Sequence, residues 1–394
     1  MRGTLLATTI LAGASVLAAA AHAADGGPVE ITIGGYMQAY ANYASQSDGV
    51  GPDGVSGTAD DAPGTNRRNF GFMREGEIHF NGRTVLDNGL KVGVHVELEA
   101  EDDVDQIDES YLWMENNLGR IQYGKAHPAS YIMFYGAPTP VDGLGINTPN
   151  FLPVNPSNTA GVGNMISTPA TYVGVQKVET LTYFTPRFVG IQLGVSYTPT
   201  ACQAGNTGNN PCGGSYTGQQ LDNVAGQAYD GLSIGANYVN SFGAFDVGVY
   251  AGYNQADNGV SGGAVGTNTG DPSQWGAGAS IGYMGFTLGG GYRSSTNIGL
   301  VQDMDGNDWN MGLTYETGPW TFGGQYGQSE AKLAGRTDDF QGGMVGGMYT
   351  LGPGINLNAA LQYFDWSTNS SNAAIKNAAT NEAWNVMLGT SITF

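Results

Sequence analysis

The sequence predicts an all-β fold, a transmembrane up-and-down antiparallel β-barrel of about sixteen strands in a single domain. Segments of about ten residues with alternating apolar and polar or small side chains recur from Glu30 to Phe394, and such alternation gives a strand one apolar face. Tight turns and long polar loops join these segments in turn, as is typical of membrane barrels. After the first 23 residues, no stretch approaches the roughly 18 consecutive apolar residues of a membrane helix.

The N-terminus has the features of a secretory signal peptide. Arg2 supplies a positive charge, residues 5–20 are apolar, and Ala21-His22-Ala23 is a small-x-small cleavage site. An uncleaved anchor is the alternative, but the apolar stretch is rich in Ala and short for a membrane span. We therefore expect a signal peptide over residues 1–23 and one barrel domain over residues 24–394.

Each expected strand is recognised by apolar side chains at every second position. The last strand carries Trp384, Val386, Leu388, Ile392 and Phe394 on one face. The other fifteen are marked in order by Ile31–Tyr43, Ile78–Phe80, Leu90–Leu98, Leu112–Met114, Ile121–Tyr123, Leu181–Tyr183, Val189–Tyr197, Leu232–Tyr238, Phe245–Tyr253, Trp275–Tyr283, Phe286–Tyr292, Trp309–Tyr315, Trp320–Tyr326, Val345–Leu351 and Ile355–Tyr363. Aromatic residues at the strand ends are expected to form a girdle at each bilayer interface.

The connections between these strands alternate in length. Tight turns are expected at residues 87–89, 117–119, 186–187, 242–243, 284–285, 318–319 and 352–354, and the long loops include residues 45–68, 125–176 and 199–228. Seven short and eight long connections fit an up-and-down barrel with both termini on the short-turn side. A β-sandwich, the main soluble alternative, needs no such asymmetry.

A sheet that spans a bilayer must close on itself, because lipid offers no partner for edge backbone groups. About sixteen strands enclose a lumen too wide for side chains to fill. The third long loop, residues 125–176, is rich in Pro, Gly and aromatic residues and contains Lys125, Tyr131, Tyr135 and Asp142. Its aromatic content indicates that it packs on another surface, so we expect it to fold inward and to form a constriction in the lumen.

The chain is strongly acidic and contains only two cysteines. Without Arg2 it carries 13 basic against 34 acidic residues, so nucleic acid is not an expected partner. Cys202 and Cys212 lie in one polar stretch, and in an exported protein this favours a local disulfide. Free thiols or a two-cysteine metal site are weaker alternatives, because no His or third Cys lies nearby.

Several motifs resemble those of the general Gram-negative porin family, specifically the porins of α-proteobacteria. Residues 87–99, Asp-Asn-Gly-Leu-Lys-Val-Gly-Val-His-Val-Glu-Leu-Glu, resemble the family's second hairpin. Residues 117–125 are similar to the strand before its constriction loop, residues 181–190 to its Tyr-x-Ser-Pro-x-Phe-x-Gly turn, and Phe394 to its outer-membrane assembly signal. The resemblance implies a trimer of sixteen-stranded barrels in the Gram-negative outer membrane, each with an inward-folded third loop.

Two departures from the family pattern concern charge. Glu77 stands where the family commonly has a basic residue. The family's constriction loop is acidic, whereas between Lys125 and Lys177 this chain has only Asp142 besides His127. The family's selectivity filter is therefore not transferred to this chain.

A hairpin symmetric about Asn88 predicts which charges face the lumen. Glu77 would oppose Glu99, His79 would oppose Glu97, and Glu75 would oppose Glu101 in the acidic run that follows. The expected pore-lining residues are Glu75, Glu77, His79, Arg83, Lys91, His95, Glu97, Glu99, Glu109 and Arg120. They are interpreted either as solvated lumen residues or as determinants of cation preference. Arg74 falls on the lipid-facing parity, which predicts a bulge or a shifted register.

The acidic run at residues 101–105 offers Asp102, Asp103 and Asp105 as hard oxygen ligands for Ca²⁺, and residues 303–308 form a second acidic run. Neither has the distal Glu of an EF-hand, so solvated loop charge is the alternative to a Ca²⁺ site. No other cofactor is expected. No catalytic motif accompanies the three histidines that follow the signal peptide, so the protein is not expected to be an enzyme.

Together these observations predict an outer-membrane porin with a water-filled channel for passive diffusion of small hydrophilic solutes and ions, with a modest cation preference. Outer-membrane lipid and two further copies of the chain are the expected partners. One alternative is a substrate-selective porin in which aromatic residues within 131–151 stack on sugars. A surface β-rich adhesin without a pore is the other.

Overall fold

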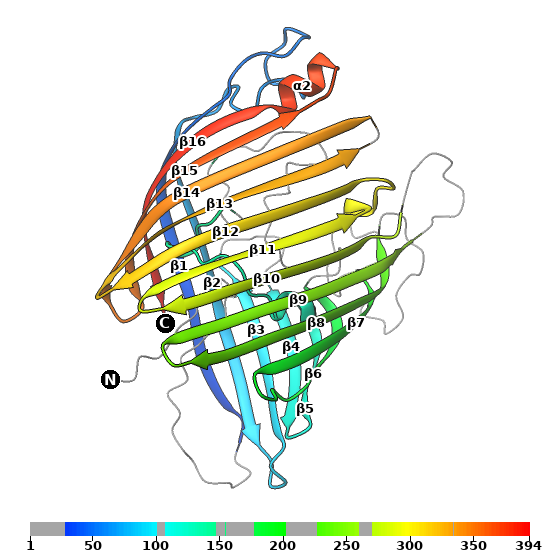
Figure 1. The fold of residues 1–394 in the computed structure, drawn as a ribbon, viewed down its shortest axis with the longest axis vertical. Helices are drawn as coiled ribbons and strands as arrows, with labels where there is room; N and C mark the ends of the chain where they lie inside the picture. Colours follow the sequence, from blue (N-terminus) through cyan, green and yellow to red (C-terminus); the bar gives the residue numbers. More distant parts are fainter. Residues whose placement is uncertain are drawn as a thin grey trace.

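The chain folds into one closed up-and-down β-barrel (Figure 1). The computed structural model describes residues 28–100, 107–146, 154, 177–201, 227–259, 270–333 and 335–394, and in these ranges sixteen antiparallel strands form a continuous wall. The all-β prediction and the predicted strand number are therefore confirmed. The expected signal peptide, residues 1–23, lies outside the described residues. None of the described helices is long and apolar enough to span a bilayer.

The first half of the wall consists of β1 (Glu30–Gln46), β2 (Phe70–Val85), β3 (Lys91–Glu99), β4 (Ile107–Asn116), β5 (Gly119–Ala126), β6 (Val178–Phe184), β7 (Ile191–Thr200) and β8 (Ala228–Phe242). The second half consists of β9 (Phe245–Asn258), β10 (Ser273–Tyr283), β11 (Phe286–Thr296), β12 (Asp305–Thr317), β13 (Trp320–Leu333), β14 (Arg336–Gly352), β15 (Ile355–Thr368) and β16 (Asn381–Thr393). Short helices lie in three connections, namely α1 (Ala129–Ile132), the 3-10 turn η1 (Ile298–Leu300) and α2 (Ala373–Ala379).

Side chains alternate between the barrel interior and its outer face with the period that the sequence predicts. On β16, Trp384, Val386 and Leu388 are 50%, 46% and 61% exposed, whereas the intervening Asn385 and Met387 are fully buried. The outer face of the barrel carries a band of exposed apolar side chains on its strands, and this is the surface that lipid covers. The period of two therefore assigns each side chain to lipid or to the interior.

The two ends of the chain join the barrel into a ring. β1 pairs with β2 on one side and with β16 on the other, and the last residue takes part in this closure. The backbone N–H of Phe394 donates to the carbonyl of Gly35 at 3.1 Å, and the N–H of Gly35 donates back at 3.0 Å. Closure leaves no open strand edge, which is the condition for a sheet in lipid.

Six of the seven tight turns lie at or within one residue of where the sequence places them, but the turn expected at residues 186–187 lies at Val189 and Gly190, whose φ values are 48° and 88°. At the connection between β10 and β11, Met284 and Gly285 both have positive φ, 49° and 86°, as a two-residue type I′ hairpin requires. Gly89 has φ of 82° in the turn between β2 and β3. These turns set the register of the hairpins on either side of them.

Two predictions about the strands are wrong. One of the eight connections expected to be long, between β13 and β14, consists only of residues 334–335. Polar pairs such as Glu330 with Asp339 and Lys332 with Thr337 continue the ladder beyond the apolar band, because backbone hydrogen bonds do not depend on side-chain polarity. Arg74 marks no bulge, since it lies opposite Ala39 in unbroken register, exposed on the outer face.

The helix α2 was not expected from the strand pattern. Asn372 caps its first turn, because the Asn372 side chain accepts hydrogen bonds from the N–H groups of Ala374 and Ile375. The side chain of Asn377 donates to the carbonyl of Asp60 at 2.8 Å, so α2 is tied to the first long loop at one rim of the barrel (Figure 1).

Leu388→Lys places a charge in the middle of the apolar band of β16. We expect it to lower the free energy of unfolding by about 2–4 kcal/mol, because an ammonium group at mid-membrane depth is poorly solvated. The measurement is urea unfolding in lipid vesicles. Glu382→Lys, at the exposed end of the same strand face, is the control and should change stability by about 1 kcal/mol or less. Equal effects of the two variants would contradict a lipid-facing Leu388.

Candidate functional site: the barrel interior

The inner wall formed by β2, β3 and β4 carries a cluster of ionisable side chains. We call it the β2–β4 cluster, and it comprises Glu75, Glu77, His79, His95, Glu97, Glu99, Asp108 and Glu109. Their exposed fractions are 8%, 4%, 7%, 8%, 6% and 6% for Glu75, Glu77, His79, His95, Glu97 and Asp108, while Glu99 and Glu109 are half-buried. All but Asp108 alternate with exposed apolar side chains such as Ile78 and Leu112, so they point into the barrel.

The register of the β2–β3 hairpin brings the cluster together. Glu77 lies opposite Glu99 and His79 lies opposite Glu97, as symmetry about Asn88 predicted. The third expected pair cannot be compared, because Glu101 lies outside the described residues. Nε2 of His79 is 2.7 Å from Oε2 of Glu77, and Nε2 of His95 is 2.7 Å from Oε1 of Glu97. Histidines and carboxylates therefore form one contiguous network.

A β-bulge on β4 adds to the cluster a carboxylate that the period of two in the sequence does not predict. Val96 pairs with Ser110 and Leu98 pairs with Ile107, so Asp108 and Glu109 together face Glu97. A bulge places two residues opposite one and redirects a side chain. Asp108 is thereby turned inward and forms an ion pair with Lys177. Only an irregular ladder produces this contact, and nothing in the local sequence signals it.

Two residues beside the cluster, outside the strands, have shifted pKa values. Burial, and secondarily the nearby ammonium of Lys177, lower the pKa of His127 well below its ordinary value. The His127 ring is therefore neutral at pH 7, and it stacks on Tyr131 with ring centroids 3.8 Å apart. Burial alone would lower the pKa of Lys177, but Asp108 outweighs burial and raises it. Lys177 is therefore a permanent cation.

The three basic residues expected in the lumen lie toward the short-turn end of the wall. Nζ of Lys91 is 2.8 Å from Oε1 of Glu115, and the two side chains are 54% and 36% exposed. The guanidinium of Arg120 lies over the ring of Trp113 at 4.7 Å, and Arg83 is exposed. These cations are displaced along the barrel axis from the β2–β4 cluster.

The third long loop runs along the opposite inner wall over its described residues, 127–146 and Val154. Its first part is fixed by strand side chains, since the N–H groups of Ala129 and Ser130 donate to the hydroxyls of Ser196 and Ser233 at 2.8 and 3.1 Å. Further along, the carboxamide of Gln325 donates to the carbonyl of Pro138 at 2.7 Å. All three partners belong to the inner face of the barrel. The predicted inward fold is thus confirmed for these residues.

Glycines on the strands make this close approach possible. We call them the glycine track, and they are Gly194, Gly235, Gly248, Gly278, Gly289, Gly312 and Gly346, on seven of the eight strands from β7 to β14. A methyl group built on Gly278 would lie 2.1 Å from the carbonyl oxygen of Tyr135, and one on Gly289 would lie 2.3 Å from that of Gly136. The track lets the backbone of the loop lie directly on the wall.

Further along, the loop is anchored to β1, β15 and β16, where the two ends of the chain close the barrel. Oδ2 of Asp142 accepts hydrogen bonds from Asn356 at 2.7 Å and from Ser391 at 2.5 Å, and the hydroxyl of Tyr40 donates to the Asp142 carbonyl. Asp142 is therefore a structural anchor. Apolar loop residues pack there against Phe340, Phe364 and Trp366, namely Val141, Leu144, Ile146 and Val154. The three aromatic side chains point into the barrel, because they alternate with the lipid-facing residues on their strands.

The remaining expected loop residues also contact the protein. Lys125 is buried at the end of β5, and its ammonium donates to the carbonyl of Ile107. Phe134 packs edge-on against Tyr250 at 5.3 Å between ring centroids. The ring of Tyr135 lies over Gly248. The aromatic residues of the loop thus fasten it to the wall.

Several expected site residues cannot be placed. Cys202, Cys212, Asp102, Asp103 and Asp105 lie outside the described residues. In the second acidic run, Asp308 is fully buried and is bound by Nε of Arg293 at 2.8 Å, so it serves as an ion-pair partner instead of a Ca²⁺ ligand.

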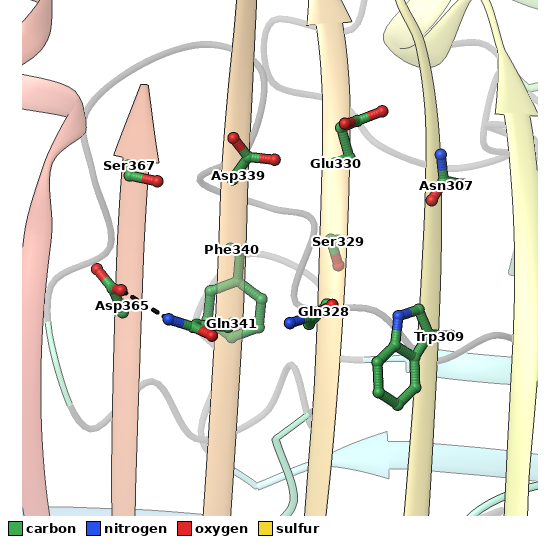
Figure 2. A pocket seen from close by; sticks show the side chains of 10 residues that line it. All are labelled: Asn307, Trp309, Gln328, Ser329, Glu330, Asp339, Phe340, Gln341, Asp365 and Ser367. Carbon is green, nitrogen blue, oxygen red and sulfur yellow. Dashed lines mark hydrogen bonds between the residues drawn. The ribbon is translucent and has the colours of Figure 1, made fainter. Parts of the chain in front are cut away.

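An open polar cleft of about 400 Å³ lies across β12 to β15 at some distance from the β2–β4 cluster (Figure 2). Figure 2 shows Glu330, Asp339 and Asp365 on neighbouring strands, with Gln341 donating a hydrogen bond to Asp365 at 2.9 Å. Glu330, Asp339 and Asp365 share the parity of the lipid-facing residues on their strands. The cleft therefore belongs to the outer face of the barrel and not to the lumen.

A closed barrel with an apolar outer face, a polar inner face and an inward-folded loop defines a transmembrane channel protein. The sequence profile of the Gram-negative porin family matches residues 7–369, so the chain belongs to this family. It is accordingly a channel protein of the Gram-negative outer membrane. No curated sequence relative matches the chain.

Solved structures share the fold at low sequence identity. An OmpF of Salmonella typhi in complex with daunomycin is 15% identical, with a TM-score of 0.59 over 92% of this chain and 97% of that chain. An anion-selective porin of Comamonas acidovorans is 16% identical, with a TM-score of 0.57 over 93% and 100%. The outer-membrane channel DcaP of Acinetobacter baumannii is 14% identical, with a TM-score of 0.57 over 93% and 97%. At such identity the likeness concerns the fold alone.

Gly278→Ala tests the glycine track. The added methyl group would overlap the Tyr135 carbonyl, so the loop must move off the wall, and we expect the free energy of unfolding to fall by about 1–3 kcal/mol. The control is Gly343→Ala on β14, where the nearest atom to an added methyl group is 3.6 Å away. Urea unfolding followed by tryptophan fluorescence measures both, and equal stabilities would contradict close packing at Gly278.

Proposed function

We propose that the channel conducts small hydrophilic solutes and ions by passive diffusion, with a modest preference for cations. The observation that carries the cation preference is the β2–β4 cluster, which concentrates six carboxylates on one stretch of the inner wall. Diffusion along a water-filled lumen needs no covalent chemistry, so the proposal includes no catalytic activity.

Several basic side chains near the inner wall are already paired with aspartates. Lys177, Arg293 and Arg336 are each bound to an aspartate, namely Asp108, Asp308 and Asp338. These ion pairs are internally neutral. Five glutamates remain in the β2–β4 cluster in addition to Asp108, and charges in low-dielectric surroundings are screened less than exposed ones. Their field attracts cations into the lumen.

The size limit of the channel is proposed to come from the third long loop. Residues 127–146 follow the inner wall from β7 round to β16 and β1, and the β2–β4 cluster occupies the wall beyond β1. The loop brings little charge of its own, since Asp142 is the only acidic or basic residue besides His127 between Lys125 and Lys177. In this proposal the loop sets the width and the strand wall sets the charge.

The alternative of a sugar-stacking track is less well supported. Such a track needs aromatic faces that are open to solute. Phe134 is buried against Tyr250, Tyr131 stacks on His127, and Tyr135 lies on Gly248. Because these rings are used for packing, we favour a general diffusion channel.

Reversal potential in a planar bilayer tests the charge argument. Under a KCl gradient we expect stepwise conductance and a zero-current potential of the sign for cations. Glu77→Gln combined with Glu97→Gln should lower the permeability ratio of K⁺ to Cl⁻ on the order of twofold. Glu382→Gln removes one charge from the exposed outer face and should leave the ratio unchanged. An anion-signed potential of the unmodified protein would refute the proposed selectivity.

The family resemblance and the trimer form in which an OmpT of Vibrio cholerae was solved support a homotrimer. We expect detergent-purified protein to have three times the mass of one chain by light scattering with the detergent contribution subtracted. Dissociation into single chains at micromolar protein, with conductance retained, would show that the monomer is the functional unit.

A further inference from the structure

We propose that His79, His95, Glu77 and Glu97 form a binding site for a divalent transition metal ion of the Zn²⁺ class on the inner wall of the channel. Two sets of three potential ligands share Glu97, namely Glu77, His79 and Glu97, and His95, Glu97 and Glu109. In each set the ligand atoms all lie within 4.8 Å of one another. The site does not depend on the proposed ion selectivity.

The strand ladder places these side chains side by side. His79 and Glu97 are direct cross-strand partners, and His95 is the partner of Asn81. Glu77 precedes His79 by two residues, and His95 precedes Glu97 by two, so all four point to the same face. Directly opposed residues have Cβ atoms about 5 Å apart, which is close enough for their side chains to meet at one ion.

The two imidazole rings converge on the same carboxylate oxygen. Oε1 of Glu97 is 2.7 Å from Nε2 of His95 and 3.7 Å from Nε2 of His79. The side chains of Glu77, His79 and Glu97 are only 5%, 8% and 8% exposed. Two buried carboxylates within 4.8 Å of each other repel, and a metal ion bound between them and the histidines offsets that repulsion.

The second nitrogen of His95 indicates how the ring is oriented. Nδ1 of His95 lies 2.6 Å from Oδ1 of Asn81, an acceptor that favours the tautomer with the proton on Nδ1. In the neutral ring, Nε2 then presents its lone pair toward Glu97, which is repulsive unless a second proton or a metal ion lies between them. A histidine whose far N–H is held by an oxygen is the usual arrangement of a metal ligand.

The ligand types select the metal. Imidazole nitrogen together with carboxylate oxygen suits Zn²⁺ and related transition metals, whereas Ca²⁺ prefers oxygen ligands alone. Zinc bonds of about 2.0–2.2 Å in tetrahedral geometry separate neighbouring ligand atoms by roughly 3.3 Å. The contacts of 2.7 Å would therefore widen by about half an ångström on binding, which side-chain rotation allows.

Titration of the detergent-purified full chain with ZnCl₂ by isothermal calorimetry tests the site, and visible absorption of the Co²⁺-loaded protein reports its ligand geometry. We expect one strong site per chain. His79→Gln combined with His95→Gln should weaken Zn²⁺ binding at least tenfold, with loss of the tetrahedral Co²⁺ spectrum. His127→Gln is the matched control, because it removes a histidine that belongs to neither set and should retain binding.

Single-channel conductance shows whether each variant is folded. It is recorded in the presence of a chelator, so that this readout does not depend on metal binding. Absence of Zn²⁺ binding by the unmodified chain would overturn the proposal. So would Ca²⁺ binding as tight as Zn²⁺ binding, or loss of the site in His127→Gln while the double variant keeps it. Since selectivity is measured without metal, an anion-selective channel that still binds Zn²⁺ would refute the proposed function and leave this site intact.

Discussion

The structure depends on one constraint, that every backbone N–H and C=O within the bilayer must find a partner in the protein itself. Lipid provides none, so the sheet has to close. The hydrogen bonds between Gly35 and Phe394 and the pairing of β1 with β16 complete that closure at the chain ends. Once the ring exists, each strand has a lipid side and a lumen side, and the rest of the molecule is arranged on those two surfaces.

The interior of such a ring is too wide to be filled by wall side chains alone. Here two stretches of the wall, β7 to β14 and β2 to β4, differ in the side chains that they present to the interior. From β7 to β14 small residues allow residues 127–146 to lie flat, with their backbone against Gly278 and Gly289 and with Asp142 bound to Asn356 and Ser391. From β2 to β4 the wall keeps long ionisable side chains. The packing of the loop and the concentration of charge therefore belong to separate parts of the wall.

Concentrating carboxylates on one part of the wall creates an electrostatic cost that must be offset. Lys177 offsets part of it at Asp108, and the two histidines bind the glutamates next to them. The histidines give the cluster nitrogen ligands as well as oxygen ligands. The residues proposed to bias ion flow are in this way also the residues proposed to hold a metal ion.

The amino-acid sequence by itself determined the faces of the strands, because a period of two assigns each side chain to lipid or lumen without knowledge of its neighbours. It also determined the pairing of Glu77 with Glu99 and of His79 with Glu97, since a tight turn around Asn88 sets the register of the hairpin. Only the tertiary structure decided that Asp108 points inward, because a bulge breaks the period. It alone also decided the route of residues 127–146, the use of the glycine track and the convergence of His79 and His95 on Glu97. These features depend on contacts between strands and loop segments far apart in the chain, and local patterns carry no information about such distances.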